Sequence, residues 1–182
     1  MRTFIAIELG DELKDYILKK QQVVKNNSEK GNFSIRENFH LTLKFIGETN
    51  NLQIDALKEA IDITTKEFAS FRLKLGSLGH FSKKNKKIIW IGISEGEIVL
   101  QQLFDILENN LDKQGFEREE RGLNPHITIA RQVVLKRDFD KISKEINMLH
   151  KEIPVKKISL MESTRVNGIL TYRPIYIKLL KE

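Results

Sequence analysis

Two stretches of this sequence, far apart in the chain, repeat one pattern of apolar and polar residues. The first is "NFHLTLKFIG", beginning at Asn38, and the second is "NPHITIAR", beginning at Asn124. In both stretches leucine or isoleucine alternates with polar side chains, which is typical of a strand with one buried face. The fold must therefore contain two strands that each keep a polar face open to solvent or to a ligand.

Alternation places a histidine and a threonine on the same face of each strand. His40 and Thr42 share the polar face of the first strand with Lys44, and His126 and Thr128 share that of the second. The Cα atoms of each His–Thr pair are then roughly 6.5 Å apart. The residues expected on the buried face of the first strand are Leu41, Leu43 and Phe45.

The remaining periodicity predicts further strands and helices. Helices are expected within 11–24, 48–69, 97–115 and 136–150, and a loop is expected over 25–32. Further strands are predicted at 2–9, 70–82, 87–94, 155–163 and 173–180. Each half contains strands, a helix, an H-x-T strand and another helix directly after that strand, and no linker separates the halves. This order predicts an α+β fold in which residues 1–182 form one bilobal domain. Its two pseudo-symmetric lobes would each carry an antiparallel sheet with flanking helices around a central cleft.

Composition narrows the classes of function. The 182 residues include no cysteine, which excludes a disulfide framework and a thiol nucleophile. The net charge of +6 favours anionic partners such as nucleic acid or nucleotides. The first 15 residues are too acidic for a signal peptide, and no window reaches the roughly 20 apolar residues of a membrane span. A cytoplasmic protein with no membrane partner is therefore expected.

Three kinds of site could explain the histidines. A lone strand histidine is most simply a structural residue that forms local hydrogen bonds. A matched pair of such histidines instead favours a functional site. A metal site lacks supporting ligands, because no carboxylate shares the strand face. A Ser-His-Asp triad lacks a G-x-S-x-G elbow.

In-line displacement at phosphorus fits the pair better. Histidine titrates near pH 6.5, so one imidazole can act as a base while the other, protonated, acts as an acid. A base would activate the attacking oxygen on one side, and an acid would protonate the leaving oxygen on the other. Hydroxyl groups of Thr42 and Thr128 can donate to the non-bridging oxygens. No metal or other cofactor is required.

At these residues the sequence resembles the two-histidine phosphoesterase superfamily. "FHLTLKFIG" and "PHITIAR" are similar to its paired H-x-T-x motifs, nearest to those of the bacterial and archaeal RNA 2′,3′-cyclic phosphodiesterases, also called the 2′–5′ RNA ligase (LigT-like) family. Looser similarity extends to "RTFIAIEL", "LGHFSKKNKKIIWIGI" and "LMESTRVNGILTY". The resemblance thus covers nearly the whole chain.

The resemblance implies an enzyme that hydrolyses 2′,3′-cyclic phosphate at RNA 3′ ends, or in nucleotides, to a 2′-phosphomonoester. It further implies that some members join RNA through a 2′–5′ bond. By motif position, His40 would protonate the leaving 3′ oxygen and His126 would activate water. Thr42 and Thr128 would hold the phosphate, and Arg131 matches the family's arginine after the second motif. Such an enzyme is expected to act as a monomer without a cofactor.

Several alternatives stay open at this point. Strict alternation places Arg131 on the face opposite His126, so it can bind ligand only if the strand ends or twists there. Lys44 is either a solvated lysine or a phosphate ligand. The lysines of 83–87 are either a solvated hairpin tip or a contact for RNA backbone. The protein could also be a non-catalytic RNA- or nucleotide-binding module, or a phosphodiesterase for a small cyclic nucleotide or a 2′–5′ oligonucleotide.

Overall fold

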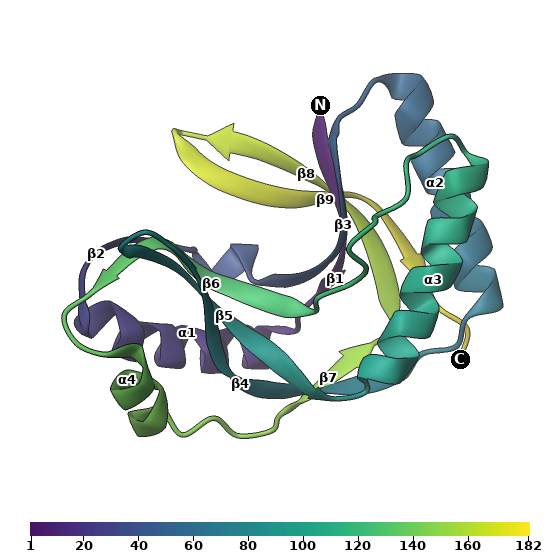
Figure 1. Ribbon diagram of the computed structural model, residues 1–182. Helices are drawn as coiled ribbons and strands as arrows, with labels where there is room; N and C mark the ends of the chain where they lie inside the picture. Colours follow the sequence, from purple (N-terminus) through teal and green to yellow (C-terminus); the bar gives the residue numbers. More distant parts are fainter.

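The computed structural model describes residues 1–182, which form two antiparallel β-sheets and four α-helices (Figure 1). This arrangement confirms the predicted α+β class with two sheets. No helix in it combines the length and the apolar character that crossing a membrane would require. The two sheets contribute to one cluster of 34 buried side chains. We infer from this shared core that the chain folds as a single domain.

The first sheet has four strands in the order β3-β1-β8-β9, all antiparallel. It places the first histidine strand at its edge. The strands are β1 (Arg2–Glu8), β3 (His40–Glu48), β8 (Lys157–Val166) and β9 (Ile169–Leu179). β8 and β9 form a long hairpin that projects from the body of the protein (Figure 1).

The second sheet has five strands in the order β2-β6-β5-β4-β7, also antiparallel. It places the second histidine strand, β6, between β2 and β5. The strands are β2 (Ser28–Phe33), β4 (Phe71–Lys83), β5 (Lys86–Glu95), β6 (His126–Leu135) and β7 (Glu152–Val155).

Two of the four helices, α2 and α3, lie side by side (Figure 1). α2 begins with a capping box, in which the Asn50 side chain accepts from the Gln53 amide and the Gln53 side chain accepts from the Asn50 amide. α3 is followed by Gly115 at φ +86°, as expected for a glycine that ends a helix. The helices are α1 (Asp11–Asn26), α2 (Asn51–Glu67), α3 (Glu97–Lys113) and α4 (Phe139–Glu145).

Two predicted elements differ in the structure. The stretch 25–32, expected to be a loop, contains most of strand β2, whose polar residues pair with β6 and so extend the sheet. The helix predicted over 136–150 stops at Glu145, and Leu149, which lies beyond its end, is exposed. His150, expected at that helix end, lies beyond it, and its Nδ1 is 3.0 Å from the carbonyl oxygen of Leu75. Apolar spacing alone did not reveal where pairing or packing stops.

Candidate active site

The two histidine strands come together in space. β3 and β6 belong to different sheets, yet they are in contact and supply opposite walls of one cleft. His40, Thr42, His126, Thr128 and Arg131 all line this cleft. The structure therefore brings together the two histidines, the two threonines and Arg131, to which the resemblance assigns the chemistry and the phosphate binding.

Arg131 reaches the cleft because β6 contains a β-bulge. Thr128 pairs with Trp90, but the next residue of β5, Ile89, pairs with Ala130, so Ile129 is an extra residue. The alternation of faces is shifted by one, which turns Arg131 to the side of His126. The carbonyl oxygen of Ile129 accepts from the buried Gln21 Nε2 at 2.8 Å, and this bond holds the bulge in place.

β3 contains the matching bulge in the first motif. Ala6 pairs with Thr42 and Ile5 pairs with Lys44, so Leu43 is the extra residue. Phe45, expected in the core, is instead 68% exposed and lines the cleft. Phe45 follows His40 by five residues, as Arg131 follows His126. Both motifs therefore present three side chains to the cleft instead of two.

Lys44 is not a solvated lysine, and it does not share the face of His40. The bulge turns its side chain inward, where only 8% of it is exposed and Nζ lies 2.7 Å from Glu108 Oε1. Nζ also donates to the carbonyl oxygen of Glu117 at 2.5 Å. Both alternatives offered by the sequence were wrong, because both assumed uninterrupted alternation.

The cleft is suited to an anion. Its empty volume is about 410 Å³, and Arg131 is the one lining residue with a permanent charge. Arg131 forms no ion pair with any carboxylate of the chain. A guanidinium without a carboxylate partner is well suited to bind phosphate oxygens in a bidentate manner.

Both imidazoles are oriented by the same type of hydrogen bond. His40 Nδ1 is 2.6 Å from the carbonyl oxygen of Asn38, and His126 Nδ1 is 2.7 Å from that of Asn124. A carbonyl oxygen only accepts, so Nδ1 carries the proton in each ring and Nε2 is the atom available for chemistry.

The two Nε2 atoms have different surroundings. His40 Nε2 is 2.9 Å from Thr42 Oγ1, which donates to it when the ring is neutral. His126 Nε2 has no hydrogen-bond partner in the chain, so its lone pair is available to a water molecule in the cleft. This difference favours His126 as the base.

Both histidines are held neutral in the free protein. Burial lowers the pKa of His40 from 6.5 to about 4, although the bond to Asn38 opposes the shift, and the charge of Arg131 lowers it further. Burial also lowers the pKa of His126, again with a smaller contribution from Arg131. In the free protein both shifts favour the neutral ring, rather than the one neutral and one charged ring that the sequence suggested.

Each histidine also packs against two aromatic rings that contact each other. Phe4 and Tyr172 have centroids 4.9 and 5.2 Å from that of His40. Phe81 and Trp90 lie 5.3 and 5.9 Å from His126. These contacts fix the ring planes and exclude water from one side of each imidazole, consistent with the lowered pKa values.

A second hollow adjoins the cleft and shares Phe45, Arg131 and Tyr172 with it. Arg2 and Arg165 also line this hollow, which runs toward the β8–β9 hairpin. Aromatic faces next to guanidinium groups can accommodate a nucleoside beside its phosphate.

Sequence reasoning missed four residues that line the cleft. Asn38 is the most informative, because its side chain donates to the carbonyl of Leu170 and accepts from the amide of Tyr172, which ties His40 to β9. A signal for it existed, since both motifs begin with N-x-H. The four residues are Ser34, Asn38, Phe45 and Tyr172.

The fold matches a group of solved phosphoesterases. LigT of Escherichia coli, in its complex with 3′-AMP, superimposes with a TM-score of 0.79 at 22% identity, covering 100% of this chain and 98% of that one. A protein of Thermus thermophilus gives the same TM-score at 19% identity over the same shares of the two chains. This similarity defines the class of fold, that of LigT.

Sequence comparison identifies the family. The model described as the 2′-5′ RNA ligase superfamily matches residues 27–167, and the chain belongs to this superfamily. A relative from Methanocaldococcus jannaschii, named RNA 2′,3′-cyclic phosphodiesterase, is 32% identical over 100% of this chain and 99% of its own. One of the same name from Thermotoga maritima is 29% identical over 97% and 94%. The resemblance noted in the sequence is thereby confirmed.

Proposed function

We propose that this protein is an RNA 2′,3′-cyclic phosphodiesterase that opens the cyclic phosphate at RNA 3′ ends and leaves a 2′-phosphomonoester. Full-length relatives of that name support the assignment. The observation that carries it is the convergence of two H-x-T motifs and an unpaired Arg131 on a single cleft without carboxylates.

The two histidines divide the proton transfers of one displacement. His126 Nε2 takes a proton from water, whose oxygen forms a bond to phosphorus. The bond from phosphorus to the 3′ oxygen breaks, and His40 Nε2 gives its proton to that oxygen. The phosphate remains on the 2′ oxygen, and the two histidines have exchanged protonation states.

His40 must gain a proton before it can act as the acid. Its pKa of about 4 leaves it neutral in the free protein near pH 7. A bound cyclic phosphate brings a negative charge next to the ring, which raises this pKa. The acid is thus charged mainly when substrate is present, and Thr42 then accepts from Nε2 or turns toward the phosphate.

Thr42, Thr128 and Arg131 would hold the non-bridging oxygens, where negative charge concentrates in the transition state. A 5′-hydroxyl could replace water as the nucleophile on the His126 side. Its oxygen would bond to phosphorus while the 3′ oxygen leaves, which gives a 2′–5′ linkage. This ligation is the second activity we infer, and the superfamily to which the chain belongs supports it.

An assay of 2′,3′-cyclic mononucleotides and of RNA ending in 2′,3′-cyclic phosphate tests the proposal. We expect turnover with 2′-phosphate as the product, and unchanged rates in the presence of a chelator. Tight binding without turnover would instead indicate a binding module. A 3′-phosphate product would mean that the 2′ oxygen leaves instead of the 3′ oxygen. Turnover of 2′–5′ oligonucleotides alone would mean that these, and not RNA 2′,3′-cyclic phosphates, are the substrate class.

The state of the protein in the cell stays a prediction. One chain supplies both histidines, so a monomer has a complete site, and light scattering on the purified protein would test the predicted monomer. The cytoplasmic location inferred from the sequence awaits fractionation of cells.

A further inference from the structure

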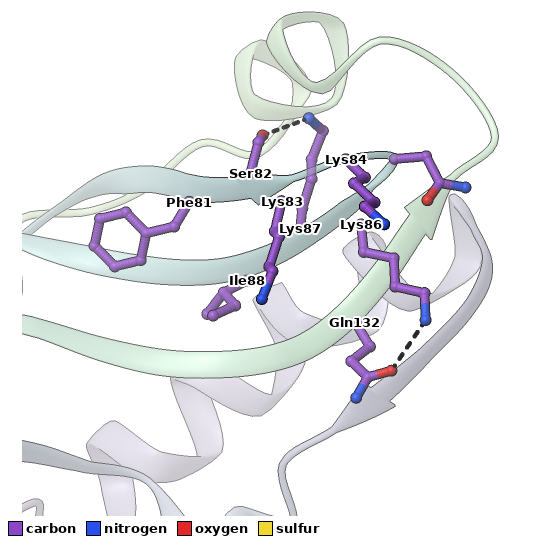
Figure 2. Close-up of a pocket in the computed structure, with 9 residues that line it drawn as sticks. Phe81, Ser82, Lys83, Lys84, Lys86, Lys87, Ile88 and Gln132 are labelled. Carbon is purple, nitrogen blue, oxygen red and sulfur yellow. Dashed lines mark hydrogen bonds between the residues drawn. The ribbon is translucent and has the colours of Figure 1, made fainter.

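The tip of the β4–β5 hairpin concentrates positive charge that nothing in the chain neutralises. Lys83, Lys84, Lys86 and Lys87, here called the hairpin lysines, line one hollow with an empty volume of about 840 Å³. Figure 2 shows them extending from the hairpin tip, with Phe81 farther along the same strand. None of the four forms an ion pair with a carboxylate.

This arrangement costs stability. Lys83 and Lys86 are directly opposite each other across the two strands, and like charges in that position repel. Lys84 adopts φ +57°, a left-handed conformation that usually belongs to glycine or asparagine. The lysine side chains find only neutral partners, with Lys86 donating to Gln132 and Lys87 donating to Ser82 (Figure 2). A bound polyanion would relieve the repulsion.

The hairpin is structurally continuous with the cleft. The Phe81 ring lines the lysine hollow and also packs edge-on against His126 at 5.3 Å. Gly92 of β5 pairs with His126 of β6. Lys87 precedes Gly92 by five residues and lies nearer the tip of the hairpin. Five residues of strand span about 17 Å. Stacked nucleotides rise by about 3.4 Å each, so roughly five of them cover this distance.

We propose that the hairpin lysines form a second binding site for RNA, which holds backbone phosphates several nucleotides away from the cyclic phosphate in the cleft. The proposal rests on the function proposed above and adds a substrate class to it. RNA chains of about five nucleotides or more reach both sites, whereas a mononucleotide reaches the cleft alone. Chain length therefore determines how well a substrate binds.

A series of RNA substrates of one to ten nucleotides, each ending in 2′,3′-cyclic phosphate, tests this inference. The variant replaces all four hairpin lysines with glutamine. The control, K19Q/K66Q/K113Q/K181Q, removes the same charge from exposed lysines that line none of the pockets described. We expect kcat/KM of the wild type and the control to rise with length up to about five nucleotides and that of the hairpin variant to stay flat. All three should act equally on the mononucleotide.

Salt dependence supplies a second readout. Each phosphate contact to single-stranded RNA contributes about 0.7 to the slope of log K against log salt, so loss of two contacts lowers it by about 1.4. A hairpin variant that keeps the wild-type length dependence and slope would overturn the inference. Loss of the length dependence in R2Q/R165Q, with the hairpin variant normal, would place the RNA in the other hollow.

Binding of a labelled twelve-nucleotide RNA, followed by fluorescence anisotropy, separates this inference from the proposed function. Should no cyclic phosphate be opened while hairpin-dependent RNA binding persists, the function proposed above fails and the RNA site stands. If the hairpin variant binds this RNA as tightly as the control, the RNA site is excluded. Equal hairpin-dependent binding to vesicles of anionic phospholipid, without any effect of RNA length, would also contradict it.

Discussion

Lys44 and Glu108 form an ion pair of 2.7 Å that is almost completely buried, with side chains 8% and 3% exposed. Lys44 follows Thr42 by two residues, and Glu108 belongs to α3. Glu108 Oε2 also accepts from the amide of Glu119 at 2.8 Å, and Lys44 donates to the carbonyl of Glu117. The pair thus connects the strand of the first histidine to the segment that leads to the second.

Removing one partner leaves the other charge buried and unpaired. Lys44→Met should lower the free energy of unfolding by about 3–5 kcal/mol, measured by urea denaturation. The double variant Lys44→Met, Glu108→Met should recover much of this loss, because no isolated charge remains. A single variant within about 1 kcal/mol of the wild type would contradict the importance of the pair.

Arg131 is expected to act on both histidines and on the phosphate. Its charge contributes to lowering the pKa values of His40 and His126, so Arg131→Gln should raise both, as followed by NMR of the imidazole protons. The loss of a bidentate ligand should also lower kcat/KM by roughly tenfold to a hundredfold. Arg131→Lys keeps the charge and should leave the pKa values nearly unchanged. Equal pKa shifts in the two variants would argue against an electrostatic effect.

The pH profile should reflect the neutral state of the free histidines. kcat/KM reports groups of the free enzyme, and both imidazole pKa values lie below 6.5 there. On the high-pH side of the bell-shaped profile, kcat/KM should therefore decline with a midpoint below pH 6.5. In kcat, both limbs should move to higher pH, because bound phosphate favours protonated histidine. A kcat/KM that stays constant up to pH 8 would refute the assignment.

Gly79 gives the Trp90 ring the space it occupies. A Cβ atom at Gly79 would lie 2.2 Å from this ring, so Gly79→Ala must displace it, at a cost of about 1–3 kcal/mol. Trp90 is the single tryptophan and packs near His126, so its fluorescence should shift while kcat falls several-fold. Gly10→Ala is the control, since a Cβ there meets nothing within 4 Å. An unchanged spectrum for Gly79→Ala would show that the ring is not held as described.

Much of the fold could be predicted because helix and strand periods are plain in the sequence. The buried face of α1 and the hairpin around the lysines follow from local spacing and turn residues. The strand β2 could not be foreseen in this way, since its residues are polar and its pairing depends on β6.

The two bulges explain which side chains of the site could not be placed from the sequence. One extra residue at Leu43 and one at Ile129 reverse the faces of Lys44, Phe45 and Arg131. No local signal marks either bulge, because Leu43 and Ile129 suit a regular strand equally well. Tertiary contacts, such as the hydrogen bond from Gln21 to Ile129, determine where a bulge forms. The histidines and threonines precede the bulges, so alternation placed them correctly.

The most direct test of the account is turnover of an RNA 2′,3′-cyclic phosphate by His40→Ala, His126→Ala and the double variant. Each single change should lower kcat by about 10²–10⁴, with the fold retained by circular dichroism. Acid and base serve one displacement, so the double variant should be little worse than either single variant. Near-normal turnover in either single variant, or multiplied losses in the double variant, would contradict the claim that both histidines act on one phosphorus.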